Sequence, residues 1–202
     1  FFDETHKVKN KTGETILKYY APTKQYYGFH FEQYNESIFL PIIRDKIRAL
    51  NPSKEEYYLV YLPSFHPNEI IDCLSSIKDS RWKVFSPFAQ EVTSQFNVDV
   101  FPVDERLFTK SLESCTGVLC GAGFELPAES LYLKKKLFVI PIKGQYEQLC
   151  NCEALKNIGV DYAFELDKVK IQKWVDQTKI IEVDFPDQTE EIIQKVILEA
   201  DI

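Results

Sequence analysis

TGVLCGAGFELPAESLYLKKKLFVIPIKGQYEQLCNC, residues 116–152, is the stretch that decides the fold of this chain. Its first part, Thr116–Cys120, is an apolar run without polar alternation, which is typical of a parallel strand buried on both faces. A glycine turn at residues 121–123 follows. Pro127 suits the first turn of a helix, which we expect to continue to Lys135.

A second strand and helix complete the stretch. Leu137–Ile142 is again apolar, and we expect a helix from about Tyr146 to Asn157, ended by Gly159. Two successive strand and helix units place two loops side by side at the carboxyl ends of neighbouring strands. Open parallel sheets bind their ligands at this edge, so the sequence predicts a ligand site there.

The polar residues of the stretch are few and lie near these two loops. Glu129 comes early in the first helix, where its carboxylate could accept both vicinal hydroxyls of a ribose. The start of that helix offers free N–H groups to a diphosphate. Glu147, Gln148 and Asn151 gather at the start of the second helix, which suits a polyhydroxylated ligand.

The order of these elements is similar to that of a known family. G-x-G-x-x-x-x-x-E, an apolar strand ending in proline, and E-Q-x-x-N resemble the donor-binding half of nucleotide-sugar glycosyltransferases with two Rossmann domains, the GT-B type. The group with the nearest likeness contains the peptidoglycan N-acetylglucosaminyltransferase and the UDP-glucuronosyltransferases. The resemblance covers about residues 57–164. It implies an α/β fold with a doubly wound parallel sheet, and a short remnant of the amino-terminal domain before it.

The resemblance also assigns roles to individual residues. It implies that Glu129 holds the ribose and that Glu147, Gln148 and Asn151 contact the donor sugar. The nucleotide and its phosphates would be bound by Ser64, His66, Phe101, Val103, Gly121, Ala122 and Gly123, with residues 101–103 at the uracil. For His66, packing within its own loop is an equally good interpretation. Glu129 could instead be a solvated charge near a helix start.

Composition limits the remaining possibilities. The 202 residues suffice for one large domain with an appendage, and the net charge of −7 argues against nucleic-acid binding through a basic surface. No apolar run reaches the roughly 20 residues of a membrane span. The five cysteines, an odd number, predict reduced thiols in a cytoplasmic protein. We expect no metal and no cofactor, and we interpret Lys134, Lys135 and Lys136 as a solvated helix end.

The rest of the chain predicts three regions. Residues 1–50 would be the tail of an amino-terminal acceptor domain with a linker helix at Ser37–Leu50, after strands at Thr15–Tyr20 and Tyr26–Phe31. Residues 51–185 would form the donor-binding domain, and residues 186–202 a carboxy-terminal helix. Because the chain opens on Phe1, we expect a fragment or a processed form, with the catalytic base in the missing amino-terminal domain.

The resulting function is a glycosyltransferase donor domain that binds a UDP-sugar for transfer to an unidentified acceptor hydroxyl. Two alternatives stay open. A sugar-nucleotide epimerase of the same architecture would also bind UDP. A noncatalytic binding module is favoured by Gly121, Glu125 and Leu126, which stand where the family usually has other residues.

Overall fold

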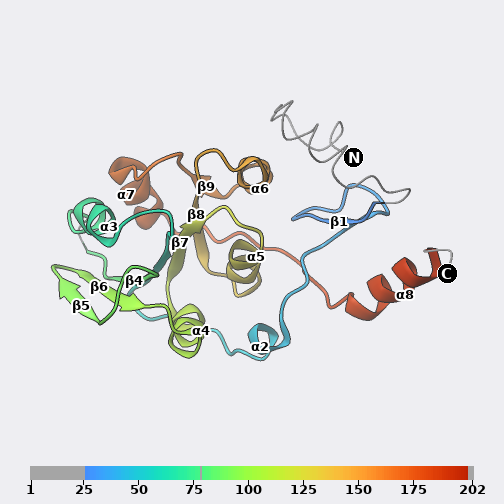
Figure 1. Ribbon diagram of the computed structural model, residues 1–202, viewed down its shortest axis with the longest axis horizontal. Helices are drawn as coiled ribbons and strands as arrows, with labels where there is room; N and C mark the ends of the chain where they lie inside the picture. The colour runs from blue at the N-terminus through green and yellow to red at the C-terminus, as the bar shows by residue number, and fades with distance from the viewer. Residues whose placement is uncertain (1–25, 78, 200–202) are drawn as a thin grey trace.

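The computed structural model describes residues 26–77 and 79–199, and its centre is a seven-stranded sheet (Figure 1). The parallel strands lie in the order β6-β4-β3-β7-β8-β9, and β5 joins the β6 edge antiparallel. This is the strand order of dinucleotide-binding Rossmann domains, so the predicted doubly wound fold is confirmed. The strands are β3 (Tyr58–Tyr61), β4 (Trp82–Ser86), β5 (Thr93–Gln95), β6 (Val98–Pro102), β7 (Gly117–Gly121), β8 (Lys136–Ile140) and β9 (Asp161–Tyr162).

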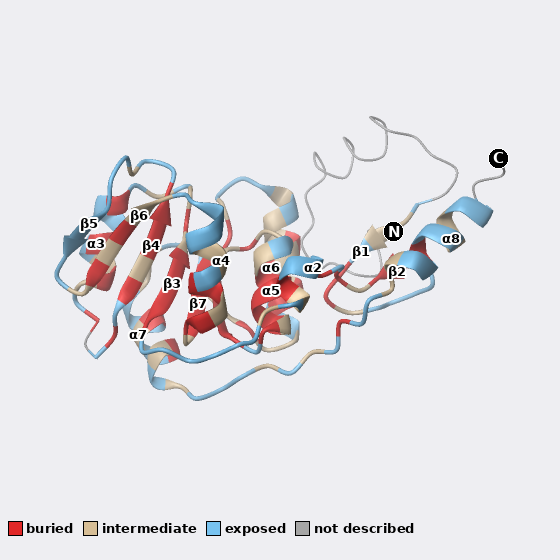
Figure 2. Ribbon diagram, turned by 90° about the horizontal axis from the view of Figure 1, so that it is seen from below, coloured by how far each residue is buried: buried red, intermediate tan, exposed pale blue. Residues whose placement is uncertain are grey.

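Helices cover both faces of the sheet, and most of the buried residues lie in the layer between them (Figure 2). Successive strand residues pack on opposite sides: Val118 joins the core under α4, α5 and α6, and Leu119 the core under α3 and α7. Strands enclosed on both faces must be apolar throughout, which explains the unbroken apolar runs. The helices are α3 (Pro67–Leu74), α4 (Glu105–Ser114), α5 (Glu125–Tyr132), α6 (Tyr146–Asn157) and α7 (Lys168–Asp176).

The segment before the sheet differs from its prediction. The helix expected at Ser37–Leu50 is instead a short strand β2 (Ile38–Phe39), an extended stretch and one turn of helix α2 (Asp45–Arg48). Pro41 explains the error, because it disfavours the helical conformation at the residue before it. β2 pairs in parallel with β1 (Gly28–Phe29), which is shorter than the predicted strand. The strand predicted at Thr15–Tyr20 lies outside the described residues.

The last helix, α8 (Thr189–Glu199), lies within the predicted carboxy-terminal region at residues 186–202 and at the same end of the molecule as β1 and β2 (Figure 1). Lys195 Nζ donates to the carbonyl of Glu36 at 2.7 Å, and the Tyr27 hydroxyl bonds to Glu199. The two ends of the described chain are therefore joined. The predicted boundaries at residues 50 and 185 remain predictions.

The end of α5 corrects another interpretation. The helix ends at Tyr132, and Lys134 has a left-handed φ of 54° that turns the chain into β8. Lys135 and Lys136 are 4% and 6% exposed, so they are not a solvated helix end.

The antiparallel edge strand β5 was not predicted. The five cysteines are free thiols, and no helix among the described residues is long and apolar enough to cross a membrane.

Candidate functional site

The carboxyl edge of the sheet contains a topological switch point between its two central strands. The chain leaves β3 towards α3 on one face and leaves β7 towards α5 on the other. The loops at residues 62–66 and 122–124 therefore lead to opposite faces, and the space between two such loops is the usual ligand position in sheets of this kind. The predicted site residues Ser64, His66 and Gly123 all lie in these two loops.

The helices that follow the parallel strands differ in how their first turns are capped. α3 is capped by the His66 side chain, α4 by Asp104 and α7 by Asp167. In α5, whose N-cap is Phe124, and in α6, whose N-cap is Gln145, the N-cap side chain makes no capping hydrogen bond with the described residues. The first N–H groups of these two helices therefore remain available to an anion, supported by the positive end of each helix dipole.

The two glycines of the turn after β7 have different surroundings. A Cβ atom added at Gly123 would meet no atom within 4 Å, so packing does not require glycine there. A Cβ at Gly121 would lie 3.5 Å from Oε1 of Gln148. Ala122, between them, is buried. The structure therefore brings the glycine turn next to the start of α6, as the adjacent loops predicted, and leaves open space over Gly123.

Three predicted residues lie in the first two turns of α6. Gln148 Oε1 accepts a hydrogen bond from the backbone N–H of Ile142 at 2.9 Å, and its Nε2 donates to Gln145 Oε1 at 3.0 Å. Glu147 is exposed and has no hydrogen bond or ion pair among the described residues. Asn151 Nδ2 is buried and lacks an acceptor within the described part of the chain. Gln148 thus fixes the loop after β8, while Glu147 and Asn151 keep unused hydrogen-bonding groups.

Glu129 has a partner that the sequence did not indicate. Arg44 Nε donates to its Oε1 at 2.6 Å and Arg44 Nη2 to its Oε2 at 2.8 Å, while Nε also lies 2.8 Å from Oε1 of Glu125. The Glu129 side chain is 2% exposed, so it is not a solvated helix-start charge. Its hydrogen bonds raise the pKa of Arg44, although partial burial acts in the opposite direction. The ribose assignment stays a prediction, and it requires Arg44 to release at least one carboxylate oxygen.

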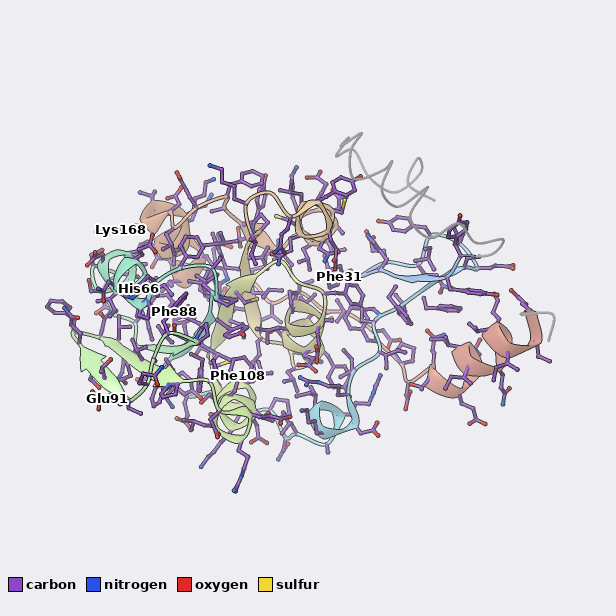
Figure 3. The ribbon with its side chains drawn as sticks, viewed as in Figure 1. Phe31, His66, Phe88, Glu91, Phe108 and Lys168 are labelled. Carbon is purple, nitrogen blue, oxygen red and sulfur yellow. The ribbon has the colours of Figure 1, made fainter. Side chains whose placement is uncertain are left out.

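His66 and Ser64 lie in the other loop of the switch point, after β3. The His66 Nδ1 accepts from the backbone of Asn68 at 3.3 Å, and its ring lies 5.7 Å from that of the exposed Phe88 (Figure 3). Ser64 is exposed and lines a cavity of about 680 Å³ between the loops after β3, β8 and β9. The other residues of that cavity wall are Phe65, Pro141, Ile142, Lys143, Gly144, Leu149, Phe164 and Glu165.

The proposed uracil segment lies farther along the same edge. β6 is separated from β7 by β4 and β3, so at about 4.8 Å per strand it lies about 14 Å away. Phe101 stacks on Phe85 with ring centroids 5.4 Å apart, and Val103 is exposed. The structure does not bring these residues to Gly123, and a ligand spanning both would have to be extended. Their role at a base remains a prediction.

Two residues near the site were missed by the sequence reasoning. Arg44 lies within Ser37–Leu50, where a linker helix was expected, and Phe88 lies in a loop without a recognisable motif. Neither carries a local signal, because both meet their partners through the tertiary fold. No group of three or more His, Cys, Asp or Glu side chains arranged to hold a metal ion occurs in the described part of the chain.

Comparison with known proteins places the chain in a family. No curated protein matches its sequence. Solved structures similar to it include the glycotransferase of kitacinnamycin, at 16% identity and a TM-score of 0.48 over 69% of this chain and 40% of that one. The glycosyltransferase SnogD from Streptomyces nogalater is 15% identical, with a TM-score of 0.45 over 85% of this chain and 50% of that one.

A third structure, the glycosyltransferase VinC in complex with DTDP, is 13% identical, with a TM-score of 0.43 over 79% of this chain and 37% of that one. The regions matched are thus half or less of each solved chain. The sequence match is broader, since the family described as Glycosyl transferase family 1 matches residues 7–178. This chain therefore belongs to glycosyl transferase family 1.

Proposed function

We propose that the chain binds a nucleoside diphosphate sugar, with a UDP-sugar as the expected donor, at the carboxyl edge of its sheet. It would be the donor-binding half of a glycosyltransferase that transfers the sugar to an acceptor hydroxyl. The observation that carries the proposal is the pair of uncapped helix starts, α5 and α6, on neighbouring strands. Family membership and the open space over Gly123 support it.

In this proposal the diphosphate lies against the first turn of α5. The backbone at Gly123 is partly exposed, a Cβ atom built there would meet no described atom within 4 Å, and the N–H groups of residues 124–127 except Pro127 provide donors. Negative charge develops on the departing nucleoside diphosphate during glycosyl transfer. Fixed N–H groups and the helix dipole would stabilise this charge, and we propose that they do so without a metal ion.

The donor sugar would lie over the start of α6. Glu147 can accept hydrogen bonds from sugar hydroxyls, and the buried Nδ2 of Asn151 would gain the acceptor that it lacks. Gln148 already bonds to the loop after β8, so its contribution would be to hold the residues that contact the sugar. The particular likeness to the peptidoglycan transferase and UDP-glucuronosyltransferase group rests on these residues. The free thiols suit a reducing, cytoplasmic location.

Two variants separate this site from a purely structural interpretation. Gly123→Ala places a methyl group in open space, so the free protein should keep its stability or gain about 0.4–1 kcal/mol. The same methyl group should hinder a diphosphate and weaken UDP binding by tenfold or more, measured by isothermal titration. Asn151→Ala should leave UDP affinity unchanged and weaken UDP-glucose or UDP-N-acetylglucosamine.

The matched control is Asn157→Ala, an exposed asparagine at the other end of α6, which should change neither affinity. Undiminished UDP binding by folded Gly123→Ala would contradict the diphosphate position. If dTDP binds and UDP does not, the assignment of the base is wrong. Conversion of the UDP-sugar without an acceptor would indicate an epimerase, and failure to bind any of these nucleotides would indicate a noncatalytic module with another ligand.

A further inference from the structure

The opposite, amino edge of the sheet contains a second cavity, of about 720 Å³. The starts of β3, β7 and β8 form its floor through Tyr58, Thr116 and Lys136. Its walls come from the segment before β3 and from the segment after α7. A cavity of this size is within the range that holds small organic ligands, about 300–1,000 Å³. β7 separates it from the proposed donor site by about 13 Å, from four steps of about 3.3 Å.

The cavity is lined by five cations and one carboxylate. The cations are Arg48, Lys54, Lys134, Lys135 and Lys136, and the carboxylate is Asp176. None of the five cations forms an ion pair with another described residue. Asp176 accepts a hydrogen bond from Gln172 at 2.9 Å. Within the described residues, the cavity therefore has more positive than negative side chains, and none of its cations is held in an ion pair.

The two buried lysines are held by neutral groups. Lys135 Nζ donates to the carbonyls of Ser53, Glu113 and Cys115 at 2.7, 2.6 and 3.0 Å. Lys136 Nζ donates to the carbonyls of Val175 and Gln177 at 2.9 and 2.5 Å. These bonds use the ammonium hydrogens but supply no opposite charge. Burial lowers the pKa of both lysines, and the charge of Lys54 lowers that of Lys136 further.

Two further lysines are able to contact a ligand directly. Lys54 and Lys134 are exposed, line the same cavity and have no hydrogen bond or ion pair with any described residue. Apolar and aromatic side chains complete the wall: Leu50, Tyr132, Leu133, Val175 and Ile180. The cavity therefore combines exposed donors for an anionic head group with an apolar surface for the rest of the ligand.

From this geometry we infer a second ligand site, which binds a phosphomonoester with a compact aromatic or aliphatic group. The phosphate would lie between Lys54 and Lys134, in the field of the two buried ammoniums, and the apolar group would lie against Tyr132 and Ile180. The same head group occurs on soluble metabolites and on lipids. The inference does not depend on the donor site, because no residue is shared between the two.

Isothermal titration with 1-naphthyl phosphate, 1-naphthol and inorganic phosphate tests the inference. The intact chain should bind 1-naphthyl phosphate at least tenfold more tightly than either part alone, and saturating UDP should not displace it. Lys54→Glu/Lys134→Glu should weaken this binding by tenfold or more while leaving UDP binding unchanged. Arg106→Glu/Lys110→Glu is the matched control, because it makes the same charge change at two exposed residues on α4.

Three results would overturn the second site. Equal losses in the two double variants would show a response to overall charge only. Displacement by UDP would place the probe in the proposed donor site, and undetectable binding at millimolar probe would show that the cavity holds no such ligand. Vesicles with and without phosphatidic acid form a separate arm. Their retention by wild type but not by Lys54→Glu/Lys134→Glu would identify a lipid head group, and no retention would identify a soluble phosphomonoester as the source.

Discussion

The ion pair between Arg44 and Glu129 is the contact whose loss should have the largest measurable effect. Arg44→Met leaves the carboxylate of Glu129, which is 2% exposed, without the guanidinium that now donates to both its oxygens. Removing one partner of a fully buried pair costs about 3–5 kcal/mol. Arg44 is 44% exposed, and solvent screens an exposed charge, so we expect a smaller loss, about 2–3 kcal/mol.

A double-mutant cycle measures this coupling. Urea unfolding of wild type, Arg44→Met, Glu129→Gln and the double variant should give a coupling free energy of about 2 kcal/mol. Glu125→Gln is the matched control: Glu125 contacts the same guanidinium at 2.8 Å but is 63% exposed, so its coupling should be below about 1 kcal/mol. Coupling to Glu129 that is no larger than coupling to Glu125 would refute the argument from burial.

The same variants test the ribose assignment. If a ribose takes the carboxylate of Glu129, it competes with Arg44, and Arg44→Met should tighten UDP binding although it destabilises the fold. A 2′-deoxy nucleotide should not gain, because it lacks one of the two hydroxyls. If Glu129 only anchors the segment before the sheet, UDP affinity should not rise in Arg44→Met. That outcome would leave Glu129 as a structural residue.

Two further predictions concern stability. Gly117→Ala should destabilise the fold by about 1–3 kcal/mol in urea unfolding, because its Cβ would lie 2.9 Å from Lys136 Cβ and 3.1 Å from Trp174 Cζ2. Burial raises the pKa of Cys115 to about 12 and that of Cys120 as well, so the unfolded chain releases these protons first and stability should fall as pH rises above about 8.5. Cys120→Ala should reduce this fall by about 1.4 kcal/mol per pH unit near pH 10, and an unchanged slope would show that this thiol is not protected.

The fold could be predicted because its central elements carry local signals. Apolar runs without alternation predicted the parallel strands, and the helix expected from about Tyr146 to Asn157 has these bounds in the structure. The error at Ser37–Leu50 arose where a helical spacing of apolar residues contained Pro41 and where Ile38 and Phe39 pair with β1. Such pairing with a distant segment overrides a local pattern. β5 was missed because its three residues are polar and exposed.

The candidate site was predictable to the level of its loops but not of its contacts. Adjacent strand ends placed Gly121 near Gln148, and the structure confirms this proximity. The partner of Glu129 could not be predicted, because Arg44 is 85 positions away in the sequence. A salt bridge between distant residues produces no pattern that can be recognised in a single sequence. The exposure predicted for Lys135 and Lys136 was wrong for a related reason. A charged run usually means exposure, and only the tertiary fold supplied the carbonyls that allow burial.

The salt bridge of Arg44 and the hydrogen bonds from Lys135 and Lys136 to backbone carbonyls lie at opposite edges of the sheet, and they give the two edges different electrostatics. At the carboxyl edge, charge compensation depends on helix dipoles and on an arginine that is partly exposed, so an incoming anion can replace protein contacts with its own. At the amino edge, the ammoniums of Lys135 and Lys136 are fixed by carbonyls and attract an anion without losing any bond to it. Binding at the first edge therefore competes with an internal contact, whereas binding at the second breaks none, and at either edge a ligand that binds only the folded chain stabilises it. This difference is why UDP should respond to Arg44→Met, whereas 1-naphthyl phosphate should not.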